Sequence, residues 1–187
     1  MKDSVGVVHG RFQLLHNDHI RYILAGKEKC KHLVIGICNP DKNLTAYSSS
    51  NPHRSKKDNN PFTYYERYQM IKGTLLDMGI QGDEFDIVPF PINYPELIFS
   101  YAPPNAKYYM TIYDAWGYEK KKTLEEIGCS IEVLWEISLE QKGISGSDVR
   151  KLIRDQKEWK EYVPGYVYSY IIANHLEERI KNNGKTD

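Results

Sequence analysis

The chain has 187 residues, and its 25 basic and 25 acidic side chains give a formal net charge of zero at pH 7. Without a single-signed field, a broad nucleic-acid-binding surface is disfavoured. A hydrophobic content of 41% is enough for a sizeable core, so we expect a single domain over residues 1–187, with a disordered tail at 182–187.

The cysteines and the N-terminal residues bear on the cellular compartment. Cys30, Cys38 and Cys129 are odd in number and form no C-x-x-C pair, as expected for reduced thiols in a cytoplasmic protein. The first residues lead into a strand rather than an apolar signal segment, and no apolar run is long enough to span a membrane. We therefore expect a cytoplasmic protein that contacts no membrane.

Strand-like apolar runs alternate with helical patterns along the chain. The expected strands are Val5–Val8, His32–Cys38, Phe85–Pro89, Lys107–Tyr113 and Ser130–Trp135. The first expected helix is capped by Asn17 or Asp18, and the second runs from the Thr63–Glu66 capping box to about Met78. A short helix is expected after Pro95, and further helices at 119–127, 147–156 and 164–181. This alternation predicts an α/β fold: a Rossmann-like parallel sheet of five to six strands, helices on both faces, and C-terminal helices that pack on the sheet edge.

The first candidate phosphate-binding segment follows the first strand. Gly10 permits a tight turn, and a helix begins a few residues later. His16 and His19 are three residues apart, so they share one face near that helix start. A helix N-terminus favours a bound anion, and Arg11 adds a planar cation suited to phosphate. The segment therefore predicts a phosphate site at the carboxyl end of the first strand.

The second candidate segment follows the fifth strand. Ser145 and Ser147 are good helix N-caps, and Gly146 allows close approach of the backbone to a ligand. Arg150, in the first turn, can reach back toward a phosphate chain. Because the carboxyl ends of parallel strands share one edge of a sheet, both segments are expected at the same site.

Other phosphate and metal chemistries are disfavoured. The chain has neither the G-x-x-x-x-G-K-[ST] loop nor a G-x-G-x-x-G segment after a strand. His16 and His19 could ligate zinc, but no third ligand is evident, and a catalytic zinc site normally has three. A metal-dependent hydrolase is therefore a distant alternative.

These segments resemble known motifs. Gly10-Arg11-Phe12-Gln13 followed by His16 and His19 resembles the H-x-G-H motif of the nucleotidylyltransferase superfamily. Ile144-Ser145-Gly146-Ser147-Asp148-Val149-Arg150 resembles its I-S-x-[ST]-x-x-R motif. Asn60-Pro61-Phe62-Thr63, followed by Glu66-Arg67, is similar to the E-N-P-F-T-x-x-E-R segment of archaeal-type nicotinamide-nucleotide adenylyltransferases. The resemblance extends over nearly the whole chain.

The resemblance implies an adenylyltransferase that joins the AMP of ATP to nicotinamide or nicotinic acid mononucleotide, releasing pyrophosphate and forming NAD or deamido-NAD. It implies Mg²⁺ without protein side-chain ligands, a homo-oligomer, and catalytic roles for His16, His19 and Arg150. The implied ATP-binding residues are Gly10, Arg11, Phe12, Gln13, His16, His19, Ser145, Gly146, Ser147 and Arg150. The implied acceptor-binding residues are Arg67, Ile92, Tyr94, Ile98, Phe99 and Thr111.

Departures from the family pattern lie mainly on the acceptor side. Asp18 replaces the glycine of H-x-G-H, Ile98 replaces a ring-stacking aromatic residue, and 111–114 replace a Ser/Thr-Gly-Asn segment. Two alternatives follow: a transferase of the same fold that uses another phosphorylated acceptor or CTP, and a nucleotide-binding regulator without turnover. A basic loop at 48–59 could act as a lid or be a solvated loop.

Overall fold

The computed structural model describes residues 2–41, 60–141 and 143–182. Their strands form one parallel sheet, in the order β3-β2-β1-β4-β5. The strands are β1 (Asp3–Gly10), β2 (Cys30–Cys38), β3 (Phe85–Phe90), β4 (Lys107–Ile112) and β5 (Ser130–Glu136). The predicted Rossmann-like α/β class is confirmed, with five strands in the described part of the chain.

The sheet divides between β1 and β4. β1 pairs with β2 along its length, from Asp3 opposite Cys30 to Gly10 opposite Ile37. Its register with β4 covers only Gly6 and Val7, opposite 107–108. Strand order also reverses here, and ligands of open α/β sheets bind beyond the carboxyl ends of the strands at such a switch point.

A tyrosine hydroxyl occupies the division. The hydroxyl of Tyr22 accepts a hydrogen bond from the backbone N–H of His9 at 3.2 Å and donates one to the carbonyl of Tyr109 at 2.7 Å. This hydroxyl therefore takes the place of a direct ladder hydrogen bond between β1 and β4 and holds their carboxyl ends apart.

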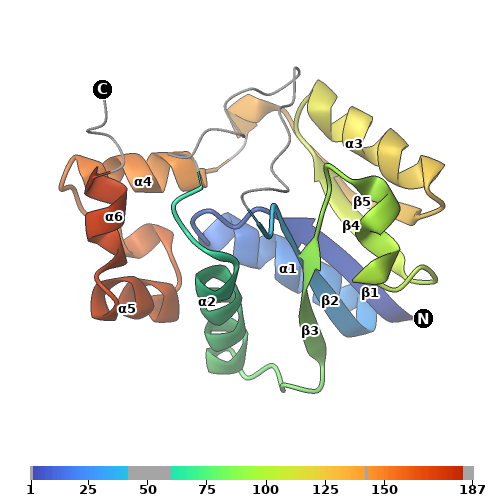
Figure 1. Ribbon diagram of the computed structural model, residues 1–187, viewed down its shortest axis with the longest axis horizontal. Coiled ribbons are helices and arrows are strands. Elements are labelled where there is room, and N and C mark those ends of the chain that lie inside the picture. The colour runs from blue at the N-terminus through green and yellow to red at the C-terminus, as the bar shows by residue number, and fades with distance from the viewer. Residues whose placement is uncertain (1, 42–59, 142, 183–187) are drawn as a thin grey trace.

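Helices cover both faces of the sheet, as predicted (Figure 1). One face packs against α1 (Asn17–Lys29) and α2 (Tyr64–Asp77), whose apolar side chains join the larger core. The other face packs against α3 (Ala115–Glu126) and the 3-10 helix η4 (Pro95–Ser100) in a second core. We call these the α1 face and the α3 face.

The predicted C-terminal helix is wrong in its extent and its packing. It is two helices, α5 (Gly165–Ala173) and α6 (Leu176–Asn182), separated where His175 has a φ of 52°. They pack against α2 and α4 (Gly146–Arg154) rather than on a sheet edge (Figure 1). An ion pair between Arg179 and Glu66, at 2.7 Å, joins α6 to α2.

Helix starts differ in part from those predicted. Thr63 and Glu66 form the predicted capping box at the start of α2. The predicted cap of α1 is wrong, because His16 is the N-cap and Asn17 is the first helical residue. α3 begins earlier than predicted, because the Asp114 carboxylate accepts a hydrogen bond from the Gly117 N–H. The remaining 3-10 helices are η5 (Leu139–Gln141) and η6 (Lys160–Tyr162).

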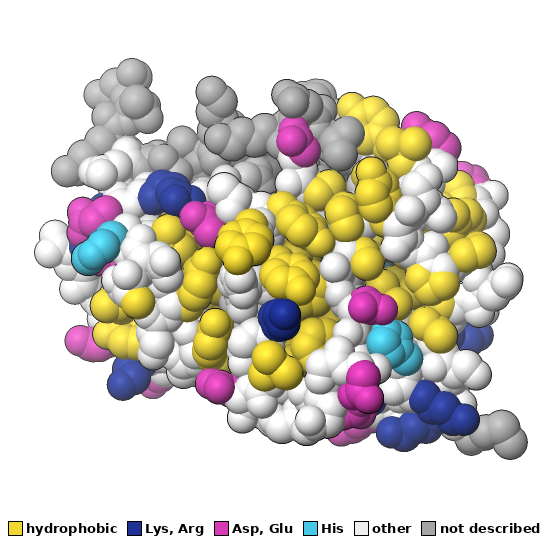
Figure 2. Space-filling view, turned by 60° about the horizontal axis from the view of Figure 1, so that its bottom comes forward, with side chains coloured by type: hydrophobic (Ala, Val, Ile, Leu, Met, Phe, Trp, Pro, Cys, Tyr) yellow, Lys and Arg dark blue, Asp and Glu magenta, His cyan; other side chains and the backbone are white. Residues whose placement is uncertain are grey.

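The surface of the described residues carries both hydrophobic and charged side chains. Figure 2 shows one face on which hydrophobic side chains spread from the middle toward the upper right, with one basic side chain among them and acidic and basic side chains nearer the edges. Among the described helices, none is both long and apolar enough to cross a bilayer. The basic loop at 48–59 and most of the predicted tail, 183–187, lie outside the described residues.

Candidate active site

The two candidate phosphate-binding segments contact each other through their backbones. A Cβ atom on Gly146 would lie 2.9 Å from the carbonyl oxygen of Gln13 and 2.9 Å from the nitrogen of Leu14. A side chain cannot fit there, so the N-terminus of α4 lies directly against the turn between β1 and α1. The prediction that both segments share the carboxyl edge of the sheet is confirmed.

Arg150 joins the same two segments through its side chain. Its guanidinium donates to the carbonyl oxygen of Gln13 and, at 3.0 Å, to the hydroxyl of Ser147. The side chain is only 2% exposed. Burial lowers the pKa of Arg150 to about 10, so the group is still a cation at neutral pH. It places a positive charge between the turn and the first turn of α4.

The start of α4 is held by a capping box. The Ser145 hydroxyl accepts from the Asp148 N–H, and the Asp148 carboxylate accepts from the Ser145 N–H at 2.9 Å. The amides of Gly146 and Ser147 belong to the first turn, which has no intrahelical acceptors for its N–H groups. These amides and the helix dipole favour an anion at the same place as Arg150.

The two histidines of the first segment lie ring to ring. The centroids of His16 and His19 are 3.8 Å apart, and His16 is 4% exposed. Phe12 is fully buried and meets His19 edge-on at 5.1 Å. Phe12 therefore supports the imidazole pair from within the core.

Other predicted nucleotide-binding residues hold the turn itself. The side-chain amide of Gln13 exchanges two hydrogen bonds, each of 2.9 Å, with the backbone of Phe62. Gly10 lies over the Phe12 ring, which a Cβ atom would meet at 2.8 Å. Arg11 is partly exposed, and its carbonyl accepts from Arg67 at 2.9 Å.

Arg67 is fully engaged with backbone carbonyls. Besides Arg11, its guanidinium donates to the carbonyl oxygens of Cys38, Asn39 and Thr63 at 2.7 to 3.1 Å. It is 1% exposed, and burial lowers its pKa to about 10. In this structure Arg67 ties α2 to the ends of β1 and β2. Its predicted contact with an acceptor phosphate stays a prediction.

Of the other predicted acceptor residues, Ile92, Ile98 and Phe99 belong to the second core on the α3 face, whereas Thr111 is two residues from Tyr109 and so shares the α1 face with it. Ile98 is fully buried in the second core, and Phe99 packs against that core from a partly buried position. Ile92, Tyr94 and Thr111 are also partly buried, near the carboxyl ends of β3 and β4. Their contact with an acceptor stays a prediction.

Asp18 turns toward the loop that precedes α4. Its carboxylate oxygen occupies the space that a Cβ atom on Gly143 would need. The two segments therefore meet at a second point. Among the described residues, no group of three or more His, Cys, Asp or Glu side chains is arranged to hold a metal ion.

Sequence reasoning missed His9 and Tyr22 as residues of this region. Tyr22 is one of 15 tyrosines and stands in an ordinary helical pattern. His9 is the more visible signal, because it interrupts an apolar strand immediately before Gly10.

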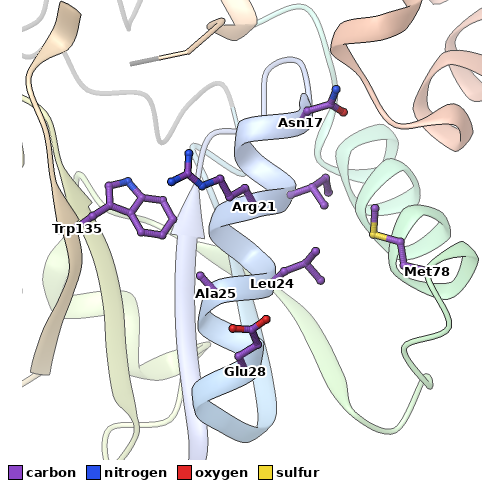
Figure 3. A pocket seen from close by; sticks show the side chains of 8 residues that line it. Asn17, Arg21, Leu24, Ala25, Glu28, Met78 and Trp135 are labelled. Carbon is purple, nitrogen blue, oxygen red and sulfur yellow. The ribbon is translucent and has the colours of Figure 1, made fainter. Parts of the chain in front are cut away.

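A groove on the outer side of α1 is a separate feature (Figure 3). Its lining residues are Asn17, Ile20, Arg21, Leu24, Ala25, Glu28, Met78 and Trp135. Arg21 and Trp135 point toward each other, with the guanidinium carbon 5.1 Å from the ring centroid. Apart from Asn17, the groove lies along α1 away from the imidazole pair.

An imidazole pair, a buried guanidinium and a helix N-terminus thus converge at the switch point of a parallel sheet. Groups of this kind at one edge of an α/β sheet are suited to binding a phosphate chain. Residues 7–152 match the cytidylyltransferase-like family, and the chain belongs to this family of nucleotidyltransferases. The predicted nucleotidylyltransferase superfamily is confirmed.

Similar proteins cover nearly all of the chain. Phosphonoformate cytidylyltransferase of Streptomyces viridochromogenes is 41% identical, over 95% of this chain and 96% of its own length. Nicotinamide-nucleotide adenylyltransferase of Saccharolobus solfataricus is 26% identical, over 98% of this chain and 99% of its own length.

A solved structure supports the fold. The bifunctional NMN adenylyltransferase/ADP ribose pyrophosphatase of Francisella tularensis, complexed with AMP and a manganese ion, superposes with a TM-score of 0.64 at 16% identity. The match covers 97% of this chain, but the chain spans only 53% of that protein.

The contact at Gly146 predicts the effect of adding one methyl group. In Gly146→Ala the new Cβ would displace α4 from the Gln13–Leu14 backbone, and we expect kcat/KM for the nucleotide to fall by about 100-fold or more, the scale of losing a positioned transition-state contact. Gly165→Ala is the matched control, because nothing lies within 4 Å of its Cβ position at the start of α5. Equal activity of the two variants would contradict the contact.

The carbonyl contacts of Arg67 predict a large loss of stability on removal of its charge. In Arg67→Met four buried or partly buried carbonyls lose a donor, and we expect the free energy of unfolding to fall by about 2–4 kcal/mol in urea titrations. Arg154→Met, at an exposed position on α4, should change it by less than about 0.5 kcal/mol. A loss of similar size in both variants would argue against the clamp.

Proposed function

We propose that this enzyme transfers the CMP group of CTP to a compact phosphonate or phosphomonoester acceptor and releases pyrophosphate. The observation that carries the proposal is the 41% identity, over nearly the full length of both chains, to a phosphonoformate cytidylyltransferase. The site supports it, because His16, His19, Arg150 and the N-terminus of α4 form one anion-binding edge.

The acceptor side also favours a compact acceptor. Ile98 stands where the adenylyltransferases are expected to stack an aromatic ring on nicotinamide, and it is fully buried in the second core. A buried aliphatic side chain offers no ring to stack against a nucleobase-like acceptor. Selection would then rest on the polar groups of a small acid.

The chemistry needs little from the protein beyond position and charge. An acceptor oxygen attacks the α-phosphorus in line, a new P–O bond forms, and the bond to the bridging oxygen breaks as pyrophosphate leaves with the electron pair. A phosphomonoester is largely dianionic at neutral pH, since its second pKa is about 6, so no general base is required. Charge on the leaving group must be neutralised.

The site residues divide this task between them. His16 and His19 would donate hydrogen bonds to the α- and β-phosphates. Arg150, with the amides of the α4 first turn, would hold the β- and γ-phosphates, and Arg11 would add a charge at the triphosphate. We propose that Mg²⁺ would enter with the nucleotide and would neutralise charge on its phosphates.

Adenylyl transfer to nicotinamide mononucleotide is the second candidate. It is favoured by the 26% identity to an archaeal adenylyltransferase over nearly the whole chain, and by the Thr63–Arg67 segment, which forms the expected capping box. A role in NAD biosynthesis, assembly into a homo-oligomer and a cytoplasmic location stay predictions.

Pyrophosphate release tests the donor and the acceptor together. We would combine CTP or ATP with phosphonoformate, simple phosphomonoesters, and nicotinamide or nicotinic acid mononucleotide, and identify each product by mass. The proposal predicts an anhydride in which CMP is joined through a P–O–P linkage to phosphonoformate or another compact acid, with CTP preferred over ATP. A product of NAD mass from ATP would establish the second candidate instead.

The imidazole pair yields a direct test of the phosphate site. We expect His19→Ala to lower kcat/KM by about 100-fold or more, because a preorganised contact to the transition state is lost. His32→Ala is the control, since His32 bonds Asp86 on the edge of the sheet away from the turn. Near-normal turnover of the His19 variant would refute the assignment.

A further inference from the structure

His9 is a buried imidazole that the reaction described above does not use. It is 4% exposed, and neither ring nitrogen has a hydrogen-bond partner in the described structure. Buried polar groups in folded proteins are nearly always paired, so an exception calls for an explanation. One such explanation is a bound ligand that supplies the missing hydrogen-bond partner.

The ring of His9 is held in a fixed orientation. It stacks on Phe90 with centroids 4.6 Å apart and planes 13° from parallel. Phe90 belongs to β3, and it reaches across β2 only because Gly36 lies between them: a Cβ atom there would meet the Phe90 ring at 2.6 Å. Residues of β1, β2 and β3 together therefore fix the position of the His9 imidazole.

His9 lies on the α3 face. Side chains two residues apart in a strand share a face, and Val7 belongs to the second core together with Phe90 and Tyr108. The backbone N–H of His9 bonds the Tyr22 hydroxyl where β1 and β4 separate. The imidazole is therefore at the switch point, on the opposite face from α1 and α4.

The geometry of in-line displacement indicates that the acceptor approaches from the α3 face. His16, His19 and Arg150 come from the α1 side, and they would hold the leaving pyrophosphate there. The attacking oxygen must enter opposite the leaving group. We infer that the acceptor lies toward the α3 face, where His9 and the partly buried Ile92 are found.

The protonation state of the His9 imidazole suits a hydrogen bond to an oxygen of the acceptor. Burial, and secondly the charge of Lys120 on α3, hold the pKa of His9 well below its ordinary value. The ring is therefore neutral at pH 7 and offers one N–H donor. Lys120 also adds positive charge on this face, with its ammonium 4.9 Å from the Trp116 ring centroid. A negatively charged oxygen is the complement of both groups.

We propose that His9 determines acceptor specificity by donating its N–H to a carboxylate oxygen of a compact phosphonate. The inference rests on the proposed function. His9 precedes Gly10 and the turn, so it meets the part of the acceptor farther from the reacting oxygen. Both ring nitrogens are covered in this structure, so the carboxylate must displace a neighbouring group to reach the ring, which limits the acceptor to a small acid.

The test compares two acceptors that differ in the carboxylate. Initial rates with CTP are measured for phosphonoformate and methylphosphonate, the latter also as a competitive inhibitor. We expect His9→Phe to raise KM for phosphonoformate by about tenfold or more, the loss of a hydrogen bond to a charged group. The KM for CTP and the constants for methylphosphonate should change by less than about threefold, within the ordinary context dependence of such contacts.

Two further variants separate recognition from structure. His9→Asn keeps a donor and should recover part of the preference for phosphonoformate. Because Phe can stack on Phe90 without an unpaired polar atom, unliganded His9→Phe should have a Tm equal to or above that of the wild type. His175→Asn, an exposed residue between α5 and α6, is the control and should leave all constants unchanged.

Each outcome has a definite meaning. Unchanged acceptor preference in His9→Phe, or equal losses with both acceptors together with a lower Tm, overturns the role of His9 while the proposed function stands. A wild type that transfers CMP to no acceptor overturns the proposed function and the His9 assignment with it.

Discussion

Two buried guanidinium groups hold the turn on which the site depends. Arg67 donates to the carbonyl of Arg11 from α2, and Arg150 donates to the carbonyl of Gln13 from α4. The turn between β1 and α1 has no strand or helix ladder to satisfy its carbonyls, so these cations do so. Both lose hydration on burial, and the contacts offset that cost only while the turn keeps its shape.

The same arrangement concentrates positive charge in a chain whose net charge is zero. Arg150 and the N-terminus of α4 add their fields at one edge of the sheet. Of the two carboxylates of the motifs, Asp148 is bound in the capping box with Ser145, and its charge raises the pKa of Arg150 against the larger lowering by burial, while Asp18 lies against Gly143. The proposed donor site would therefore attract a triphosphate through local positive charge, in a protein whose net charge is zero.

The features that could be predicted from the sequence are those that depend on residues close together in the chain. Strand positions, the Thr63 capping box and the meeting of the two motifs follow from apolar runs, cap residues and parallel topology. The break at His175, the packing of α5 on α2 and the Arg67 contacts depend on residues distant in sequence. His9 shows the limit most clearly, because its seat needs Phe90 and Gly36 from two other strands.

The proposed function gives the two faces of the sheet different tasks, which would allow one fold to serve several acceptors. In the proposed reaction, the donor phosphates would lie on the α1 face against an imidazole pair and a guanidinium, and displacing the backbone there would disturb the turn itself. The acceptor would lie on the α3 face, against side chains that take no part in the two arginine contacts. Under the proposed function, a histidine at position 9 and an aliphatic residue at position 98 would alter acceptor choice without altering the position of the α-phosphorus. Division of the sheet between β1 and β4, with Tyr22 holding the strand ends apart, keeps these two tasks separate.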